Sequence, residues 1–341
     1  MTIRLAQQID MENWDRYVQN HPSGTLFHLN AWKTVVERSF RHKSYYLIAE
    51  NHGGICGILP LFEIKSRLFG HFFISAPFAE IGGALADTPD TEQALIDEAS
   101  KLTRQQNAQY LELRNRTPVE GLETKSLYYN FRKEIFPDHD ENLKAIPRKS
   151  RAMVRNAIKK ELVSETGHHL LDPFYDILAL NYHRLGTPIF PKKFFAGFLS
   201  EFKDHADILL VKTPQGQDAA AVLFFTFKEQ MVPYYAGSDF SLRHLGPNDF
   251  MYWELMKHAV DKGLTIFDYG RSKQGTGSYS FKKHWGFTPE PLAYQYDLAG
   301  IQELPNLSPA NPKYRKKIEM WQKMPHFLTK LLGPIIAGNL A

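Results

Sequence analysis

The sequence predicts an α/β (α+β) fold of two tandem domains, each a mixed, mostly antiparallel sheet flanked by helices. Three observations predict it. The chain of 341 residues is too long for one ordinary core. Its 43% hydrophobic and 23% charged residues are typical of a chain that folds around an apolar interior. The same order of expected elements also occurs in both halves, which indicates a duplication.

That order is two helices, a hairpin, a third strand, a helix and a last strand. In the first half it falls at residues 11–20, 29–39, 45–49 with 55–64, 72–76, 91–107 and 110–113. In the second half it falls at residues 173–185, 192–204, 208–212 with 219–227, 232–236, 249–262 and 265–269. We therefore expect domains at 1–140 and 166–305, a linking helix at 141–165 and a tail at 306–341.

Charge and cysteine content narrow the functional class. The net charge of +4 does not by itself imply a nucleic acid, and DNA is not an expected partner. The single cysteine, Cys56, lies among apolar residues, which favours a buried structural thiol and rules out an internal disulfide. The N-terminus has no apolar signal core, and no apolar run approaches the ~18 residues of a membrane span. We expect a cytoplasmic protein.

Basic residues gather in the linking helix, Pro147 to Leu162. Four of them share one helical face: Arg148, Arg151, Arg155 and Lys159. An apolar row is expected along another face: Val154, Ile158 and Leu162. The basic face suits the phosphates of a nucleotide, a tRNA or a lipid-linked sugar, with Arg151 and Arg155 as candidate contacts. The alternative is a solvated linker helix without a ligand.

The tail from Tyr314 onward begins with basic residues and continues with apolar ones. Such a segment either docks on the protein core or lies on an acidic membrane surface as a peripheral contact. Docking on the core is the expectation.

The chemistry is expected between Phe267 and Phe287. This stretch is predicted to be a buried strand that ends in Asp268, a break at Gly270 and Arg271, a flexible loop at 274–278 and a strand or turn at 285–287. An acid, an arginine and a glycine-bearing loop at one end of a sheet are typical of a small-molecule site. The alternative is a solvent-exposed hairpin.

Residues 268–272 (DYGRS), with Phe281-Lys282 and residues 285–287 (WGF), resemble the end of a Fem-type transferase, the tandem-domain branch of the GNAT acyltransferase superfamily. Within that branch, the chain resembles most the FemAB-like proteins associated with exosortase/PEP-CTERM and exopolysaccharide gene clusters. Four other stretches fit the same group: residues 186–188, 191–195, 234–237 and 248–254. The resemblance covers most of the second half and is weaker in the first.

The resemblance implies two side-by-side GNAT domains and an acyltransferase that forms an amide on an amine of a cell-envelope or exopolysaccharide precursor. The acceptor would be a small-molecule or lipid-linked amine. The alternative function is a non-catalytic protein that binds polysaccharide or tRNA on the duplicated fold.

GNAT enzymes hold the pyrophosphate of acyl-CoA on backbone N–H groups of a [Q/R]xxGx[G/A] loop before a helix. Arg243 and Gly246 match this pattern, Asn248 replaces the final small residue, and Pro247 has no N–H to donate. Because no arginine precedes Gly82 and Gly83, the first domain is expected to have a degenerate donor site. Fem-type relatives use aminoacyl-tRNA instead.

Two co-substrates therefore stay open, acyl-CoA and aminoacyl-tRNA, with no tightly bound cofactor. The match at Arg243 and Gly246 favours acyl-CoA, whereas Pro247, the basic helix and Lys282 favour tRNA.

Asp268 is the candidate base or amine-orienting group, and its alternative is a hydrogen-bond acceptor at a strand end. By the resemblance, Lys282 lies near the transferred group, where it and the backbone near Tyr235 would face the oxyanion.

A second group of side chains would contact the substrates or the leaving group. Arg271 and Ser272 would contact the acceptor, although Arg271 also suits a structural ion pair. The candidate proton donors to the leaving group are Tyr234, Tyr235 and Tyr279. Only one of Tyr234 and Tyr235 can face the cleft, and Pro233 suggests a bulge in their strand. No histidine spacing indicates a metal site.

Overall fold

The computed structural model describes residues 1–66, 69–305 and 312–338. Their contacts form two compact units. The first comprises residues 1–128, 291–305 and 338, and the second comprises 129–290 and 312–337. Residues 129–165, which the sequence places in the first domain and the linking helix, thus pack with the second unit. Residues 291–305 pack with the first.

The first unit holds two sheets, with strand orders β1-β3-β4-β7 and β2-β5-β6-β8-β18-β9. Its strands are β1 (Thr2–Leu5), β2 (Lys43–Ser44), β3 (Leu47–Asn51), β4 (Gly54–Leu59), β5 (Leu61–Ser66), β6 (Gly70–Ser75), β7 (Leu85–Ala86), β8 (Leu111–Asn115), β9 (Glu123–Lys125) and β18 (Ala293–Asp297). Its helices are α1 (Met11–Asn20), α2 (Asn30–Phe40) and α3 (Pro89–Gln105). Cys56 is buried in this core, as predicted.

The second unit is built on one sheet of order β11-β12-β13-β14-β15-β10-β16, with β17 paired to β10. Its strands are β10 (Tyr128–Glu134), β11 (Val163–Thr166), β12 (Ala206–Lys212), β13 (Asp218–Phe227), β14 (Gln230–Ser238), β15 (Ile266–Asp268), β16 (Ser272–Lys273) and β17 (Pro289–Pro291). Its helices are α4 (His139–Ala145), α5 (Arg148–Lys159), α6 (Leu171–Leu185), α7 (Lys192–Phe202), α8 (Pro247–Asp261), α9 (Gly277–His284), α10 (Pro312–Lys323) and α11 (His326–Ala337).

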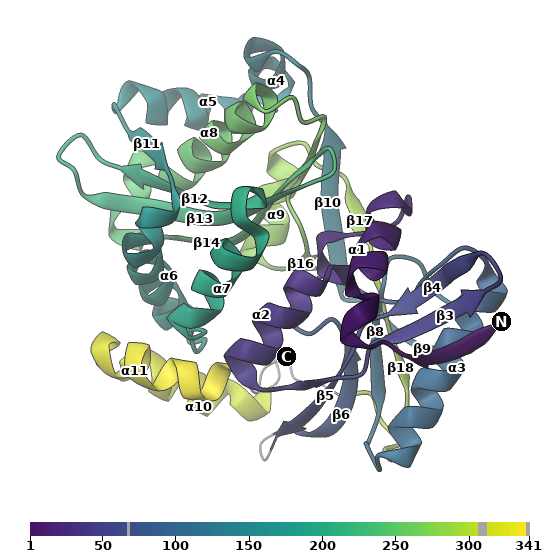
Figure 1. Cartoon of the computed structure of the whole chain (residues 1–341). Helices are drawn as coiled ribbons and strands as arrows, with labels where there is room; N and C mark the ends of the chain where they lie inside the picture. Colours follow the sequence, from purple (N-terminus) through teal and green to yellow (C-terminus); the bar gives the residue numbers. More distant parts are fainter. Residues whose placement is uncertain (67–68, 306–311, 339–341) are drawn as a thin grey trace. The chain divides into compact units, whose positions relative to one another are not determined.

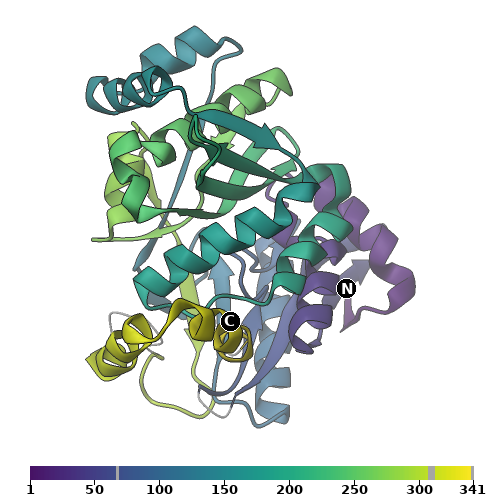
Figure 2. The same cartoon turned by 90° about the vertical axis from the view of Figure 1, so that its left-hand side faces the viewer.

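Helices cover both faces of the second sheet. In Figure 1, α6 and α7 lie on one face of β12 to β14, and α8 lies on the other. Figure 2 shows the same layers from the side. The predicted α/β class is confirmed, and helices, hairpin, third strand, helix and last strand follow in this order in both units, with β4 and β5 of the first unit in the place of the single β13.

The units exchange one strand each, which the sequence did not predict. β10 follows the first unit in the chain but pairs antiparallel with β15, placing Arg132 opposite Asp268. β18 follows the second unit but pairs antiparallel with β8, placing Tyr296 opposite Glu112. One sheet of each unit therefore contains a strand that lies far away in the sequence.

Several local expectations were wrong. The loop expected at 274–278 is replaced from Gly277 onward by α9, which runs to His284, and the turn alternative holds at 285–286. The strand expected at 55–64 is two strands, because Pro60 interrupts it. In α5, Ile158 is exposed and the buried row runs through Ser150, Val154 and Ala157.

The tail docks on the second unit, as expected. α10 and α11 pack against α6 (Figure 1). Gln322 Nε2 donates a hydrogen bond to the Arg184 carbonyl at 2.8 Å, and Thr329 Oγ1 lies 3.1 Å from His183 Nδ1. Gly333 lies so close to Ile189 that a Cβ added to Gly333 would be 2.9 Å from the Ile189 backbone nitrogen. The inward side of α11 is therefore closely packed.

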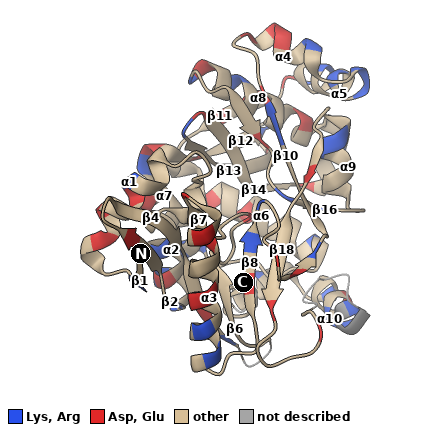
Figure 3. Ribbon diagram, turned by 90° about the vertical axis from the view of Figure 1, so that its right-hand side faces the viewer, with Lys and Arg blue, Asp and Glu red and all other residues tan. Residues whose placement is uncertain are grey.

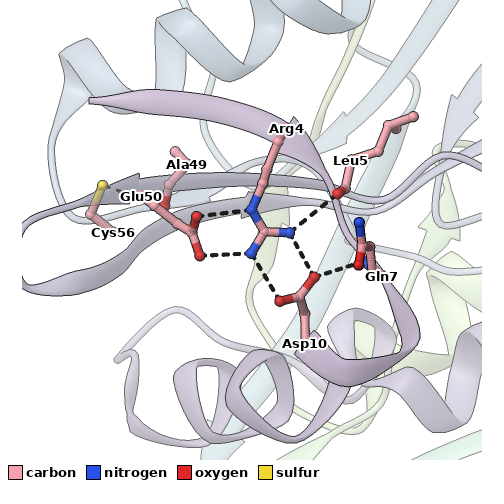
Figure 4. A network of polar contacts seen from close by, with 7 residues as sticks. All are labelled: Arg4, Leu5, Gln7, Asp10, Ala49, Glu50 and Cys56. Carbon is pink, nitrogen blue, oxygen red and sulfur yellow. Dashed lines mark hydrogen bonds and ion pairs between the residues drawn. The ribbon is translucent and has the colours of Figure 1, made fainter.

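A polar network ties β1 to the rest of the first unit (Figure 4). The Arg4 guanidinium donates two hydrogen bonds to Glu50 on β3, at 2.8 and 2.9 Å, and two to Asp10, at 2.7 and 2.8 Å. Asp10 also accepts the Gln7 N–H at 2.7 Å. The hydrogen bonds from Arg4 lower the pKa of the Asp10 carboxyl to about 2.

We expect Asp10→Asn to change the acid stability of the protein. Because the folded pKa lies below the unfolded value of 3.8, the ionised carboxylate stabilises the fold above about pH 4 and loses this effect as the pH falls toward 2. The Arg4 side chain is 35% exposed, so solvent screening limits the contribution to about 1 kcal/mol. Urea unfolding should show this loss in the wild type and not in Asp10→Asn. An equal loss in both proteins would contradict this assignment.

Candidate active site

The site begins where two parallel strands stop pairing. β14 and β15 pair only at Gln230 with Ile266 and at Met231 with Phe267. β14 then continues to Ser238, still paired with β13. Asp268 is the first residue of β15 beyond this short ladder. The Asp268 carboxylate thus lies at the point where β14 and β15 separate.

The middle of β14 is irregular, as Pro233 predicted. Leu223 pairs with Tyr235 and Phe224 with Pro233, so Tyr234 is the extra residue of a bulge. Tyr235 is buried against the rings of α7, with its centroid 5.2 Å from that of Phe195. Tyr234 is half-buried and packs edge-on against Tyr235 at 4.8 Å. Bulge and ring packing fix the backbone near Tyr235.

The expected donor loop lies at the start of α8. Gly246 has a φ of +73° and forms the N-cap, and Pro247 occupies the first helical position. The Phe250 N–H already donates to the Gly246 carbonyl at 3.1 Å. A Cβ on Gly246 would lie 3.5 Å from that of Ala157, so α5 packs directly against this end of α8. Arg243 and Asn248 beside it are exposed.

The first turn of α8 offers an anion few donors. Pro247 has no N–H, and the Asp249 carboxyl in the same turn accepts Trp285 Nε1 at 3.1 Å. Burial raises the pKa of this carboxyl. The first turn of α8 thus lacks one backbone donor and contains a carboxyl group.

The turn after Asp268 is held from two sides. Asp268 Oδ1 accepts the Gly270 N–H at 2.9 Å. Lys282 on α9 donates through Nζ to the Gly270 and Arg271 carbonyls, at 2.9 and 3.0 Å. Asp268 and Lys282 are each only 8% exposed. Two charged groups that the sequence singled out therefore lie on opposite sides of one turn, and this turn presents Arg271.

α9 delivers Lys282 to this turn. The helix begins after Thr276, whose Oγ1 accepts the Tyr279 N–H at 3.4 Å and donates to the Lys273 carbonyl at 2.7 Å. Tyr279 packs edge-on against Phe131 of β10 at 5.2 Å. The structure thus places Tyr279 at the face of α9 that meets β10.

Sequence reasoning missed Asn130 on β10. Its Nδ2 donates to Asp268 Oδ2 at 3.2 Å, and the side chain is 1% exposed. Asn130 Oδ1 and Ser272 Oγ are both buried and have no hydrogen-bond partner among the described residues. Buried acceptors without a partner are costly, so they suit a ligand that brings N–H or O–H groups. Only the exchange of β10 into this sheet brings Asn130 to Asp268.

Helix α5 packs against the start of α8 through Ala157, and its basic residues lie on the exposed side of the helix. In Figure 3, blue marks the positions of Lys and Arg along the ribbon of α5. Arg148, Arg155 and Lys159 are exposed, whereas Arg151 is half-buried and donates to the Lys144 carbonyl at 2.7 Å. Lys160 Nζ donates to the His244 carbonyl of the donor loop. The basic helix is therefore attached to the loop that the sequence assigned to the donor.

A second cationic feature near this loop was not predicted. The exposed Phe240 ring has the Arg243 guanidinium over it at 4.2 Å and the Arg184 guanidinium at 4.8 Å. One aromatic ring thus holds two exposed arginines from different elements in place.

In the first unit, the corresponding glycines have their donors occupied. The Gly82 and Gly83 N–H groups both donate to the Arg114 carbonyl, at 2.9 and 3.1 Å. The buried Arg114 side chain also bonds Glu112 at 3.0 Å and the Ala79 carbonyl at 2.7 Å. Because of these bonds, the Gly82 and Gly83 N–H groups are not available to a pyrophosphate.

The described residues contain neither a candidate metal cluster nor a helix suited to span a membrane. No group of three or more His, Cys, Asp or Glu side chains there could hold a metal ion. Across residues 1–66, 69–305 and 312–338, no helix has the length and apolar character needed to cross a membrane.

Comparison with known proteins defines the class of the second unit. Residues 144–283 match the family described as "Acetyltransferase (GNAT) domain". The match includes the donor loop, Asp268 and Lys282, whereas Asn130 on β10 precedes it. No curated protein matches the chain in sequence.

Solved structures share the fold over nearly the whole chain. The crystal structure of FemX is 16% identical, with a TM-score of 0.71 over 93% of this chain and 99% of that one. L-PGS from Bacillus licheniformis is 11% identical, with a TM-score of 0.53 over 80% and 92%. A tandem GNAT protein from the clavulanic acid biosynthesis pathway is 9% identical, with a TM-score of 0.55 over 89% and 100%. At these identities, the similarity is one of fold.

Proposed function

We propose that this protein is an acyltransferase that forms an amide by aminoacyl or acyl transfer to an amine. The observation that carries the proposal is the position of Asp268, Asn130 and Lys282. These three buried polar side chains gather where β14 and β15 stop pairing, and Asp268 and Lys282 lie in the stretch that matches the GNAT domain. The proposed acceptor is a small-molecule or lipid-linked amine of a cell-envelope or exopolysaccharide precursor.

The proposed reaction assigns a task to each group. The acceptor nitrogen attacks the carbonyl carbon of the donor, an N–C bond forms, and the C–O bond of an aminoacyl ester or the C–S bond of a thioester breaks. Asp268 takes the proton that the amine loses, and the leaving oxygen or sulfur is protonated by a tyrosine, Tyr234, Tyr235 or Tyr279. Backbone near Tyr235, with Lys282, stabilises the oxyanion.

Asn130 supports an amine as the acceptor. Because its Nδ2 donates to the Asp268 carboxylate, the amide orientation is set and Oδ1 must accept. An amine brings the N–H groups that this buried oxygen lacks among the described residues. Asp268 keeps accepting capacity beyond its bonds to Gly270 and Asn130, since a carboxylate has about four acceptor positions.

Two donors fit the GNAT fold, and we propose aminoacyl-tRNA as the first. GNAT domains typically take their acyl group from acyl-CoA, whose pyrophosphate binds the N–H groups before the long helix. Here that end lacks one N–H at Pro247 and carries the Asp249 carboxyl. The exposed cations of α5, with Arg184 and Arg243, suit a longer phosphate backbone.

Acyl-CoA is the second candidate donor. Arg243 and Gly246 directly precede α8, as the acyl-CoA loop pattern requires, and Asn248 contributes its N–H in the first turn of that helix.

The two donors can be distinguished by separate titrations of the purified protein with CoA, acetyl-CoA and deacylated tRNA, in which thermal stabilisation is measured. We expect tRNA to stabilise the protein and Arg155→Gln to weaken that effect. Stabilisation by CoA species alone, lost in Arg243→Gln, would assign acyl-CoA instead.

A non-catalytic binding protein is the second candidate function. Asp268 and Lys282 both make hydrogen bonds that hold a turn. These bonds favour the binding protein, because they give both side chains a structural role without catalysis. In that case, polysaccharide or tRNA would bind without reaction.

The remaining parts of the proposal rest on fewer observations. The link to exosortase/PEP-CTERM systems rests on the sequence resemblance alone. The proposed compartment is the cytoplasm, where the single, buried Cys56 would stay a thiol.

Gly246→Ala should separate donor binding from stability. A non-glycine residue at a φ of +73° costs about 1 kcal/mol, and the resulting strain acts on the backbone that directly precedes the α8 N–H groups, while the Cβ contacts Ala157 at 3.5 Å. Gly263→Ala is the matched control, because Gly263 has a φ of +71° at the other end of α8 and open space around it. Both variants should lose similar stability in urea, while only Gly246→Ala weakens donor binding. Equal donor affinity in the two variants would show that the donor does not bind at this loop.

A further inference from the structure

The helix α11 is apolar on two sides. Thr329, Gly333 and Ala337 are buried on its inward side. Phe327, Leu331 and Ile335 follow one another at a spacing of four on the outward side, where they are 68%, 68% and 73% exposed. Docking on α6 therefore buries only one side of α11 and leaves the other apolar side exposed.

Exposed apolar side chains concentrate in this part of the chain. Of fourteen large apolar side chains exposed in the described residues, five lie in α10 and α11: Met320, Phe327, Leu331, Leu332 and Ile335. Contiguous exposed apolar surface of this kind marks an interaction site.

The same segment holds the chain's positive charge. Residues 312–338 contain six Lys or Arg and one Glu, a net of +5, which leaves −1 of the chain's +4 for all other residues. Arg315, Lys316, Lys317 and Lys323 on α10 are exposed. An apolar helix beside a basic one is complementary to a surface that is both hydrophobic and negatively charged.

A second copy of the chain is a poorer occupant. A helix of 12 residues is about 18 Å long, and a strip about 10 Å wide along it covers about 200 Å². Stable dimers bury about 800 Å² on each partner. The same length is too short to span a bilayer, which needs about 20 residues, so the helix would lie on the surface.

We propose that α10 and α11 form a peripheral anchor that lays Phe327, Leu331 and Ile335 into the surface of an anionic phospholipid membrane, while the inward side stays docked on α6. Docking and membrane contact are thus simultaneous properties of opposite sides of α11. The anchor goes beyond acyl transfer and does not depend on it.

Co-sedimentation of the full chain with vesicles tests the anchor. Vesicles of phosphatidylcholine with phosphatidylglycerol should retain the protein at low salt, and vesicles of phosphatidylcholine alone should retain much less. Phe327→Gln, Leu331→Gln and Ile335→Gln should each lower partitioning by about tenfold. Ile9→Gln is the matched control, because Ile9 is 83% exposed in the first unit and should be neutral. Lys316→Gln with Lys317→Gln should abolish the preference for anionic vesicles.

A fluorescent probe gives a second readout that does not need those glutamine variants to fold. Cys56 is the chain's only cysteine and is buried, so Leu331→Cys accepts an environment-sensitive dye selectively. Its emission should shift to the blue with anionic vesicles, and a dye on Ile9→Cys should not respond. No shift at residue 331, or retention by vesicles that the three apolar substitutions leave unchanged, would overturn the anchor. A dimer in solution that these substitutions disperse would assign the face to a second copy.

Discussion

Asp268→Asn is expected to lower kcat for acyl transfer by about 10²- to 10⁴-fold, the range that a positioned general base contributes. Asparagine keeps the size of the side chain and an oxygen that accepts the Gly270 N–H, so the turn should persist. What the variant loses is the carboxylate that would take the proton from the amine. Single-turnover rates with saturating donor measure this loss directly.

The matched control for this variant is Asp261→Asn. Asp261 is an exposed carboxylate at the end of α8 that pairs with His139 at 2.8 Å. Its replacement removes the same charge from the same unit and should leave kcat within about twofold. If Asp268→Asn also retained nearly full activity, Asp268 would be a strand-end acceptor without a role in proton transfer.

Lys282→Met should cost both stability and rate. Methionine fills a similar volume but leaves the Gly270 and Arg271 carbonyls without their buried donor. Two hydrogen bonds from a charged group predict a loss of about 2–4 kcal/mol in the free energy of unfolding. We expect kcat to fall by about 10²-fold, because both the oxyanion partner and the position of Arg271 are disturbed.

Lys283→Met separates these effects from a general loss of charge. Lys283 is the next residue of α9 and is exposed. Its replacement should change stability by no more than about 0.5 kcal/mol. An unchanged rate in Lys282→Met despite lower stability would restrict Lys282 to holding the turn. A rise in acceptor KM with little change in kcat would instead indicate that it acts through Arg271.

Much of the fold could be predicted because periodicity and turn chemistry are local. The helix at α3 and the hairpin of β12 and β13 follow from patterns within about twenty residues. The exchange of β10 and β18 is a long-range pairing, and no local signal specifies it. Asn130 was missed for that reason, since its side chain meets Asp268 only through the exchanged strand.

The helix α9 was missed for a different reason. Gly275, Gly277 and the serines after them favour a loop by composition, and this signal outweighed the capping pattern. Thr276 as N-cap, basic residues in the last turn and Gly286 with a φ of +83° after the end do specify a helix. Reading these termini before the composition would have placed Lys282 on α9.

Amide formation at Asp268 is tested most directly by following a labelled acyl group from donor to product. Aminoacyl-tRNA charged with radiolabelled amino acids, and separately radiolabelled acetyl-CoA, are incubated with the protein and amine-bearing envelope precursors. The label is then followed through mild base, which cleaves esters and thioesters but leaves amides intact. We predict a base-resistant labelled product from one of the donors, foremost the tRNA, and its absence with Asp268→Asn. Binding of either donor without any base-resistant product would contradict the account and favour the non-catalytic binding protein.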